Sequence, residues 1–113
     1  MSIIGAIGSQ IFGNANSSVT AAGSTLATAT LLLSGFNVVT TATSLQGVQL
    51  QTALIGDCQI VFNNTSVAIT VYPYVSTARI NQIALGGGHV LAAYTACMYL
   101  FASSTQHIGF LSA

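Results

Sequence analysis

Few side chains in this sequence are able to take part in acid–base, nucleophilic or metal chemistry. The 113 residues include one acidic and one basic side chain, Asp57 and Arg79, beside two histidines, two cysteines and four tyrosines. A hydrolytic set of nucleophile, base and orienting acid would have to combine Asp57 with His89 or His107 and a serine or cysteine. No nucleophile-elbow sequence surrounds any such residue. We therefore expect a protein that is not an enzyme.

The histidines and cysteines do not have the spacing of metal ligands. His89 and His107 are far apart in the sequence, and neither has a Cys-x-x-Cys pair beside it. The sequence thus predicts no bound metal and no cofactor, the alternative being a metal shared between subunits through the histidines. Cys58 and Cys97 are expected to be two buried thiols, with a disulfide between them as the alternative.

The two charged residues and a run of glycines have structural interpretations. Asp57 follows Gly56 just before a predicted strand, where its carboxylate can accept hydrogen bonds from the amides of a turn. Arg79 is expected to pair with Asp57 or with a carboxylate of a partner, and is a candidate partner-binding residue. Gly86-Gly87-Gly88 lacks the Gly-Lys-Ser/Thr ending of a phosphate-binding loop. We expect it to form a mobile turn or a close approach of the backbone.

The tyrosines admit two interpretations. Tyr99, together with Phe101, is expected in the core of a strand-rich fold. Tyr72 and Tyr74 flank the only proline of the chain at the end of a predicted strand, where each phenol can reach a hydrogen-bond partner. The alternative is that Tyr72, Tyr74, Tyr94 and Tyr99 form a platform for a carbohydrate or a protein partner.

Strands must position these residues, because the hydropathy alternates with a period of two. Cys58, Ile60 and Phe62 share one face of a segment that ends at residue 63, which predicts a half-buried strand. The turn residues 63–66 and the alternating segment 67–72 predict that the next strand forms a hairpin with it. Strands at intervals of roughly 8–12 residues favour an all-β fold. We expect a compact antiparallel β-sandwich or jelly-roll-like barrel of about eight short strands, with an extended N-terminal arm.

The edges of the predicted sheets need protection. Edge strands are commonly guarded by lysine or other charges, and this sequence has no lysine. We expect either a barrel that closes on itself or a neighbouring subunit that covers the edges.

The predicted domains are an N-terminal arm at 1–18 and one β domain at 19–113. The expected strands span residues 25–32, 37–42, 48–51, 57–63, 67–72, 78–83, 89–92, 96–102 and 107–111.

The first 18 residues are poor helix material. They contain three glycines, each of which costs a helix about 1 kcal/mol relative to alanine. We expect an extended arm, with an N-terminal strand of the same domain as the alternative. Its large apolar side chains need burial by the same chain or by a neighbouring subunit, and are therefore candidate partner-binding residues: Ile3, Ile4, Ile7, Ile11 and Phe12.

The composition indicates a chain that assembles with others. Only 2% of its residues are charged, whereas Asp, Glu, Lys and Arg make up about a quarter of a typical soluble domain. Its polar side chains are short and neutral, with 25 Ser or Thr and 13 Asn or Gln. Such groups enter subunit contacts at a lower desolvation cost than charges do. A neutral surface has no electrostatic protection against self-association, so we expect a homo-oligomer.

Two classes of partner are not expected. Nucleic-acid binding requires clustered Lys and Arg to neutralise phosphates, and this chain has a single arginine. A membrane-spanning helix requires about 20 predominantly apolar residues in a row, and the sequence has no such run. No basic residue precedes the short apolar stretch at the start, so a signal peptide is not expected either.

Six short blocks stand in order in the middle of the chain, at residues 21–30, 37–41, 47–50, 56–63, 68–73 and 80–81. Their order and spacing over residues 21–81 resemble a pattern found in small proteins encoded by tailed bacteriophages. Two features depart from that pattern: Met98-Tyr99-Leu100-Phe101 stands where the family often has a strand with tryptophan, and residues 1–18 are not part of it.

The resemblance implies a compact β domain and a structural role in the virion. Members of the family include head decoration proteins, also called cement proteins. We therefore expect a trimeric cement protein that binds the major capsid protein over junctions between its subunits and stabilises the head. It would be assembled in the host cytoplasm and located on the capsid surface. The alternative is a receptor-binding or fibre-tip module that recognises cell-surface glycans through exposed tyrosines.

Overall fold

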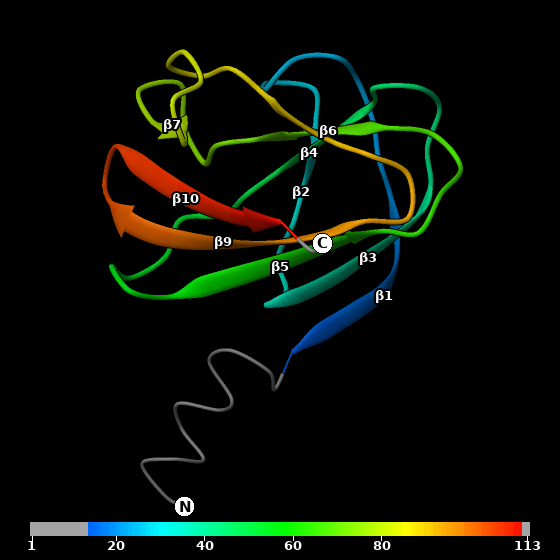
Figure 1. Ribbon diagram of the computed structural model, residues 1–113, viewed down its shortest axis with the longest axis horizontal. Helices are drawn as coiled ribbons and strands as arrows, with labels where there is room; N and C mark the ends of the chain where they lie inside the picture. Colours follow the sequence, from blue (N-terminus) through cyan, green and yellow to red (C-terminus); the bar gives the residue numbers. More distant parts are fainter. Residues whose placement is uncertain (1–13, 112–113) are drawn as a thin grey trace, which may run out of the picture.

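The computed structural model describes residues 14–111 of the chain, which form ten strands in two sheets and contain no helix. The all-β prediction is confirmed, although the ends of the strands differ from those expected. One sheet has six strands in the order β1-β3-β5-β9-β10-β7, and the other has four in the order β2-β4-β6-β8 (Figure 1). The strands are β1 (Ala15–Thr20), β2 (Thr30–Leu31), β3 (Phe36–Thr41), β4 (Gly47–Gln49), β5 (Cys58–Asn63), β6 (Ile69–Tyr72), β7 (Arg79–Ile80), β8 (His89–Leu91), β9 (Ala96–Ser103) and β10 (Gln106–Leu111).

The first six strands wind as parallel coils. The chain passes alternately through the two sheets, so that β1, β3 and β5 stack in one sheet while β2, β4 and β6 stack in the other. Ala15 is opposite Phe36, and Phe36 is opposite Ile60, so each coil lays its strand beside the strand of the coil before it. The predicted antiparallel pairing is therefore wrong for this part of the molecule, which is solenoid-like and not a sandwich or jelly roll built of hairpins.

Antiparallel strands follow the coils. β8 pairs with β6 and β9 pairs with β5, both antiparallel, and β10 returns along β9. β7 then lies beside β10 in parallel orientation. Both sheets are open: β1 and β7 are the edges of the six-stranded sheet, and β2 and β8 are those of the other. Among residues 14–111 the sheets do not close into a barrel, so that predicted alternative is wrong, and their edge strands lack a second neighbour within the described residues.

The predicted hairpin between β5 and β6 is wrong because these strands belong to different sheets. Asn63, at the end of β5, is buried at the corner between them. Its Nδ2 donates to the carbonyl oxygen of Val67 at 2.8 Å and to those of Leu91 and Ala92 at 3.1 Å each. Its Oδ1 accepts from the hydroxyl of Thr65 at 2.7 Å. One amide thus ties the end of β5 to the approach to β6 and to the exit from β8.

The core lies between the two sheets. In β5, buried and half-buried residues alternate, and the buried set begins at Gln59 and not at Cys58. The face that carries Cys58, Ile60 and Phe62, which the sequence predicted to be buried, therefore points away from the core. The largest fully buried side chains include Leu32, Val39, Val48, Leu50, Val61, Ile69, Val71, Ile80, Leu91 and Tyr99.

Tyr72 covers the central part of the outward side of the four-stranded sheet. Its ring lies where glycines leave room: a Cβ on Gly47 would come within 2.6 Å of its Cε2, and a Cβ on Gly88 within 3.1 Å of its Cε1. Its hydroxyl donates to the carbonyl oxygen of Ser24 at 2.7 Å, which links the loop at 21–29 to this sheet. Gly88 therefore provides the close backbone approach that was one of the two interpretations of the triple glycine.

The corner amide is expected to be a large contributor to stability. Asn63→Ala should lower the free energy of unfolding by about 2–4 kcal/mol, because three carbonyl groups lose their donor in a buried site. Asn64→Ala is the matched control, since the neighbouring Asn64 is exposed, and it should change stability by less than about 0.5 kcal/mol. Urea denaturation followed by circular dichroism measures both. Equal effects of the two substitutions would show that the corner does not depend on the Asn63 side chain.

Candidate functional site

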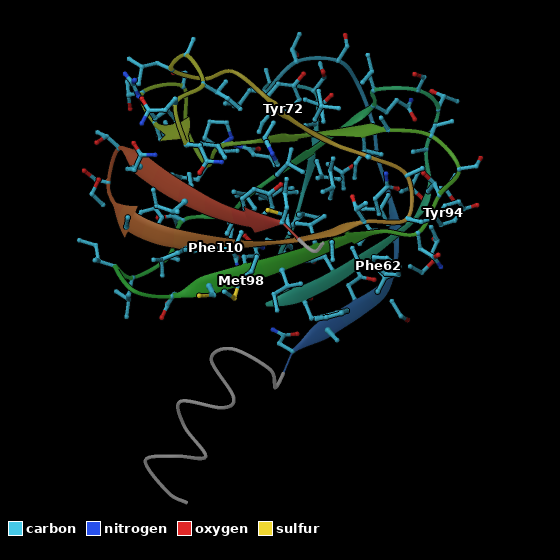
Figure 2. All side chains as sticks on the ribbon, in the orientation of Figure 1. Phe62, Tyr72, Tyr94, Met98 and Phe110 are labelled. Atoms are coloured by element: carbon cyan, nitrogen blue, oxygen red, sulfur yellow. The ribbon has the colours of Figure 1, made fainter. Side chains whose placement is uncertain are left out.

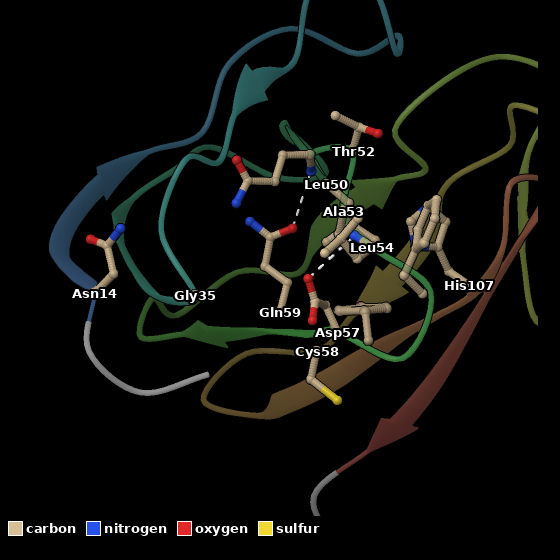
Figure 3. Close-up of a pocket in the computed structure, with 13 residues that line it drawn as sticks. Asn14, Gly35, Leu50, Thr52, Ala53, Leu54, Asp57, Cys58, Gln59 and His107 are labelled. Atoms are coloured by element: carbon tan, nitrogen blue, oxygen red, sulfur yellow. Dashed lines mark hydrogen bonds between the residues drawn. The ribbon is translucent and has the colours of Figure 1, made fainter. Parts of the chain in front are cut away.

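A cavity of about 530 Å³ lies beside the segment that leads into β5 (Figure 3). Its lining includes Asp57, Gln59, Tyr99 and His107, so it gathers several of the side chains that the sequence singled out for chemistry. Sites for small molecules commonly have volumes of about 300–1,000 Å³. What this cavity can do therefore depends on whether its polar groups are free.

The polar side chains from the start of β5 are bonded to the protein itself. Asp57 Oδ2 accepts a hydrogen bond from the amide of Leu54 at 3.2 Å, which confirms the predicted capping of the turn before β5. Gln59 Oε1 accepts from the amide of Gln51 at 3.1 Å, and its Nε2 donates to two carbonyl oxygens of the 32–34 segment at 3.1 and 3.0 Å. Figure 3 shows the first bond of each side chain. Both side chains hold neighbouring segments in place.

His107 is buried in β10, within the strand expected at residues 107–111. Its Nε2 accepts a hydrogen bond from the amide of Tyr74 at 3.3 Å. The imidazole packs edge-on against the rings of Tyr74 and Phe101, with centroid distances of 5.7 and 5.3 Å. Burial lowers the pKa of His107 to about 4. At neutral pH the ring is therefore uncharged and uses one lone pair to fix the backbone after β6.

His89 and Tyr99 form a second aromatic pair, which joins the two sheets. His89 Nδ1 and the hydroxyl oxygen of Tyr99 are 2.8 Å apart and share a hydrogen bond, and the rings meet edge-on at 5.8 Å. Burial lowers the pKa of His89 and, as the main cause, raises the pKa of Tyr99. Neither group is ionised at neutral pH, so the pair acts as a hydrogen bond between β8 and β9.

The remaining titratable groups do not form a metal site. Among residues 14–111, no group of three or more His, Cys, Asp or Glu is close enough to hold a metal ion. Both cysteines are free thiols: Cys97 is buried as predicted, whereas Cys58 is only half-buried. Burial raises the pKa of both thiols, and the charge of Asp57 adds to this effect at Cys58.

The predicted partner-binding residues fall in two places. Arg79 is half-buried in β7, opposite Gln106 of β10. In the part of the chain that the structure describes, no ion pair joins Arg79 to Asp57, whose carboxylate binds the Leu54 amide instead. Its role toward a partner stays a prediction.

β1 pairs with β3 from Ala15 onward, so the predicted boundary between residues 18 and 19 falls inside a strand. The apolar residues Ile3, Ile4, Ile7, Ile11 and Phe12 lie outside the described residues.

The tyrosines are mostly structural. Tyr99 and Phe101 are buried, which confirms their predicted place in the core. Tyr72 and Tyr74 each donate a hydrogen bond of 2.7 Å from the phenol to a backbone carbonyl, as one interpretation of the sequence required. Of the four tyrosines in the predicted platform, Tyr94 is 63% exposed while Tyr72 and Tyr99 are buried. A platform formed by all four is therefore wrong.

One candidate surface was missed by sequence reasoning. The outward face of the six-stranded sheet carries apolar side chains from β3, β5, β9 and β10, among them Phe62, Met98 and Phe110 (Figure 2). The signal was present in the sequence, because segments 36–39 and 96–101 contain apolar residues at both odd and even positions. Strands of that kind are typical of sheets that are covered on both faces.

Comparison with protein-family models, with curated proteins and with solved structures finds no match to this chain. The resemblance of residues 21–81 to phage proteins therefore stays a prediction. Within residues 14–111, the structure has no helix of the length and hydropathy needed to cross a bilayer.

The buried imidazole of His107 makes stability depend on pH. Its pKa is about 4 in the folded chain against 6.5 for an ordinary histidine, so between these values only the unfolded chain binds a proton. The free energy of unfolding should be level above pH 6.5 and fall as the pH decreases toward 4. We expect a loss of about 2 kcal/mol between pH 7 and pH 4.5, measured by urea denaturation.

His107→Gln separates this effect from other acid effects. The glutamine carbonyl oxygen can accept the Tyr74 amide but does not titrate. The variant should therefore lose less stability than the native chain over the same pH interval, whatever its stability at pH 7. His89→Gln is the comparison at the second buried imidazole, whose pKa is lowered in the same direction. An unchanged pH slope in His107→Gln would contradict the assignment.

Proposed function

We propose that this chain is a non-enzymatic structural protein of a tailed-phage particle, a cement protein that binds over junctions of the major capsid protein and stabilises the head. The resemblance of residues 21–81 supplies the class of particle. The observation that carries the proposal is an exterior that combines open sheet edges with exposed apolar side chains and almost no charge.

The exposed apolar side chains support attachment to a larger assembly. In a free monomer they would promote aggregation, because large apolar patches on soluble proteins commonly mark interaction sites. Two charges in the whole chain give little electrostatic protection. Burial against a shell and against other copies removes both hazards. The large hydrophobic residues exposed between positions 14 and 111 are Leu31, Leu33, Leu45, Leu54, Ile55, Leu85, Val90, Tyr94, Met98, Phe110 and Leu111.

Stabilisation of the head would follow from mass action. A protein that binds the assembled shell but not its separated subunits shifts the equilibrium toward the shell by an amount set by occupancy and affinity. Standard protein interfaces bury about 1,600 Å² in total, so many copies add up without any single strong contact. The chemistry of the chain fits this role, because the hydrogen bonds of its cavity side chains hold its own backbone.

Binding to heads tests the proposal directly. Heads prepared without this chain should bind the purified chain saturably, in numbers comparable to those of the major capsid protein, and should then break down at a higher temperature. Deletion of residues 2–13 should lower occupancy while the β-type circular dichroism spectrum is retained, because the apolar arm is the predicted contact. Co-sedimentation and gel densitometry measure occupancy. Unchanged occupancy of the deletion variant would remove the arm from the mechanism.

A fibre-tip module that binds glycans is the second candidate, and Tyr94 is the observation that favours it. This tyrosine is 63% exposed and has a φ of 59°, an uncommon conformation that is costly for a residue with a large side chain. A fibre-tip protein would be present in few copies per virion, and Tyr94→Ala would abolish binding to glycans without changing head stability. Copy number in purified virions therefore separates the two candidates.

A further inference from the structure

The outward side of the six-stranded sheet is a continuous apolar surface, which we call the outer face. Side chains alternate across a strand, so the residues between the buried ones on β3, β5, β9 and β10 point away from the core. Figure 3 shows the Cys58 sulfur on the side of β5 opposite to the Gln59 side chain. The outer face consists of Phe36, Val38, Cys58, Ile60, Phe62, Met98, Leu100, Ile108 and Phe110.

The register of the strands makes this surface contiguous. Phe36 is opposite Ile60, Ile60 is opposite Met98, and Met98 is opposite Phe110, so one apolar row crosses four strands. A second row joins Cys58 to Leu100 and Ile108, and a third joins Val38 to Phe62. Directly opposite residues have Cβ atoms about 4.5–5.5 Å apart, so the rows leave no polar gap between strands.

Residues 14–111 leave the outer face only partly covered. Met98 is 37% exposed and Phe110 is 50% exposed, although both lie within strands that have a neighbour on each side. On the four-stranded sheet, Tyr72 and the hydrogen bond from its hydroxyl to Ser24 cover part of the outward side, while Leu31 and Val90 at its edges stay exposed. The six-stranded sheet has the longer continuous apolar rows among residues 14–111.

The charge distribution allows this surface to face a copy of itself. The outer face contains no charged residue, and Asp57 is held in the turn by the Leu54 amide. Arg79 lies at the rim, in the edge strand β7. A two-fold contact places the same patch on both partners, so a charged patch would meet its own sign. A neutral apolar patch has no such penalty.

The size of the outer face fits a weak, reversible pairing. Three strand spacings of about 4.8 Å and a strand length of five residues give an apolar area of about 400 Å² once side-chain margins are included. Two copies would bury about 800 Å² of it, and the polar rim of the sheet would bring the total to about 1,000 Å², the lower bound for a specific interface.

From these observations we propose that the outer face is a self-association surface, on which a second copy of this chain packs sheet against sheet about a two-fold axis. This inference does not rest on the proposed function. We expect this small contact to be weak, with a dissociation constant of about 100 μM. Cys58 lies in an end row of the outer face, opposite Leu100, and would be covered in the pair, whereas Cys97 on the inner face is buried in both states.

The thiol of Cys58 reports on the pairing. The full chain should sediment as a monomer at low micromolar concentration and as a dimer near 1 mM. Over the same range, the rate of alkylation of Cys58 should fall about fivefold. At a total concentration about ten times the dissociation constant, only about one fifth of the chains remain monomeric, with the outer face free. Mass spectrometry of the cysteine-containing peptides separates Cys58 from Cys97, which serves as the internal reference.

Matched substitutions locate the contact. Met98→Gln and Phe110→Gln change exposed side chains of the outer face and should abolish both the dimer and the protection of Cys58 while the fold is retained. Leu54→Gln and Leu85→Gln are the controls, because these leucines are 70% and 54% exposed but lie outside the outer face. They should leave dimerisation unchanged.

Three results would overturn the inference. The first is a monomer at 1 mM with freely reactive Cys58. The second is protection of Cys58 that does not depend on concentration and is lost on deletion of residues 2–13, since the cover would then be the chain's own N-terminal segment. The third is an oligomer, such as the trimer expected from the phage resemblance, that is unaffected by Met98→Gln and Phe110→Gln.

Discussion

The fold depends on how backbone carbonyl groups are satisfied where the chain crosses between the two sheets. Each coil leaves one sheet and enters the other, so carbonyls near the corners have no ladder partner, and a buried group without a partner is costly. Amide side chains supply the missing donors. Asn63 serves three carbonyls at one corner, Gln59 serves two at another, and Asn37 bonds those of Ser34 and Ile60 at 2.7 and 3.2 Å. A chain almost without charges can therefore bury polar groups throughout its core.

The same amides explain which parts of the fold the sequence could and could not predict. Period-two hydropathy located most strands, because alternation is a local property of a pleated chain. The pairing of those strands is not local. Asn63 and its polar neighbours are of types that occur both in the turns of hairpins and at the corners of coils. Their types therefore could not distinguish the two topologies. The inward face of β5 was assigned wrongly for a related reason, because two of its three inward side chains are amides that look polar in sequence.

The cavity shows the same division between local and distant contacts. Asp57 caps a turn only three residues away, and that role was predicted from the Gly56-Asp57 pair. The contacts of His107 with Tyr74, and of His89 with Tyr99, depend on which strands become neighbours, and no spacing in the sequence encodes them. Burial of both imidazoles follows from those contacts. Their place in the core as neutral hydrogen-bonding groups, and not as ligands or bases, could be recognised only from the folded chain.

The outward faces of the two sheets differ in how far the chain itself covers them. Parallel strands are commonly buried on both faces. The four-stranded sheet meets this condition in its centre, because glycines at positions 47 and 88 admit the Tyr72 ring, while Leu31 and Val90 on its edge strands stay exposed. β3 and β5 of the other sheet are also parallel and also apolar on both sides, yet their outer face has no equivalent cover among residues 14–111. Phe36, Ile60 and Phe62 on this face therefore indicate a contact that residues 14–111 of one chain do not complete. Because the face carries no charge, the surface that fits it is also neutral and apolar.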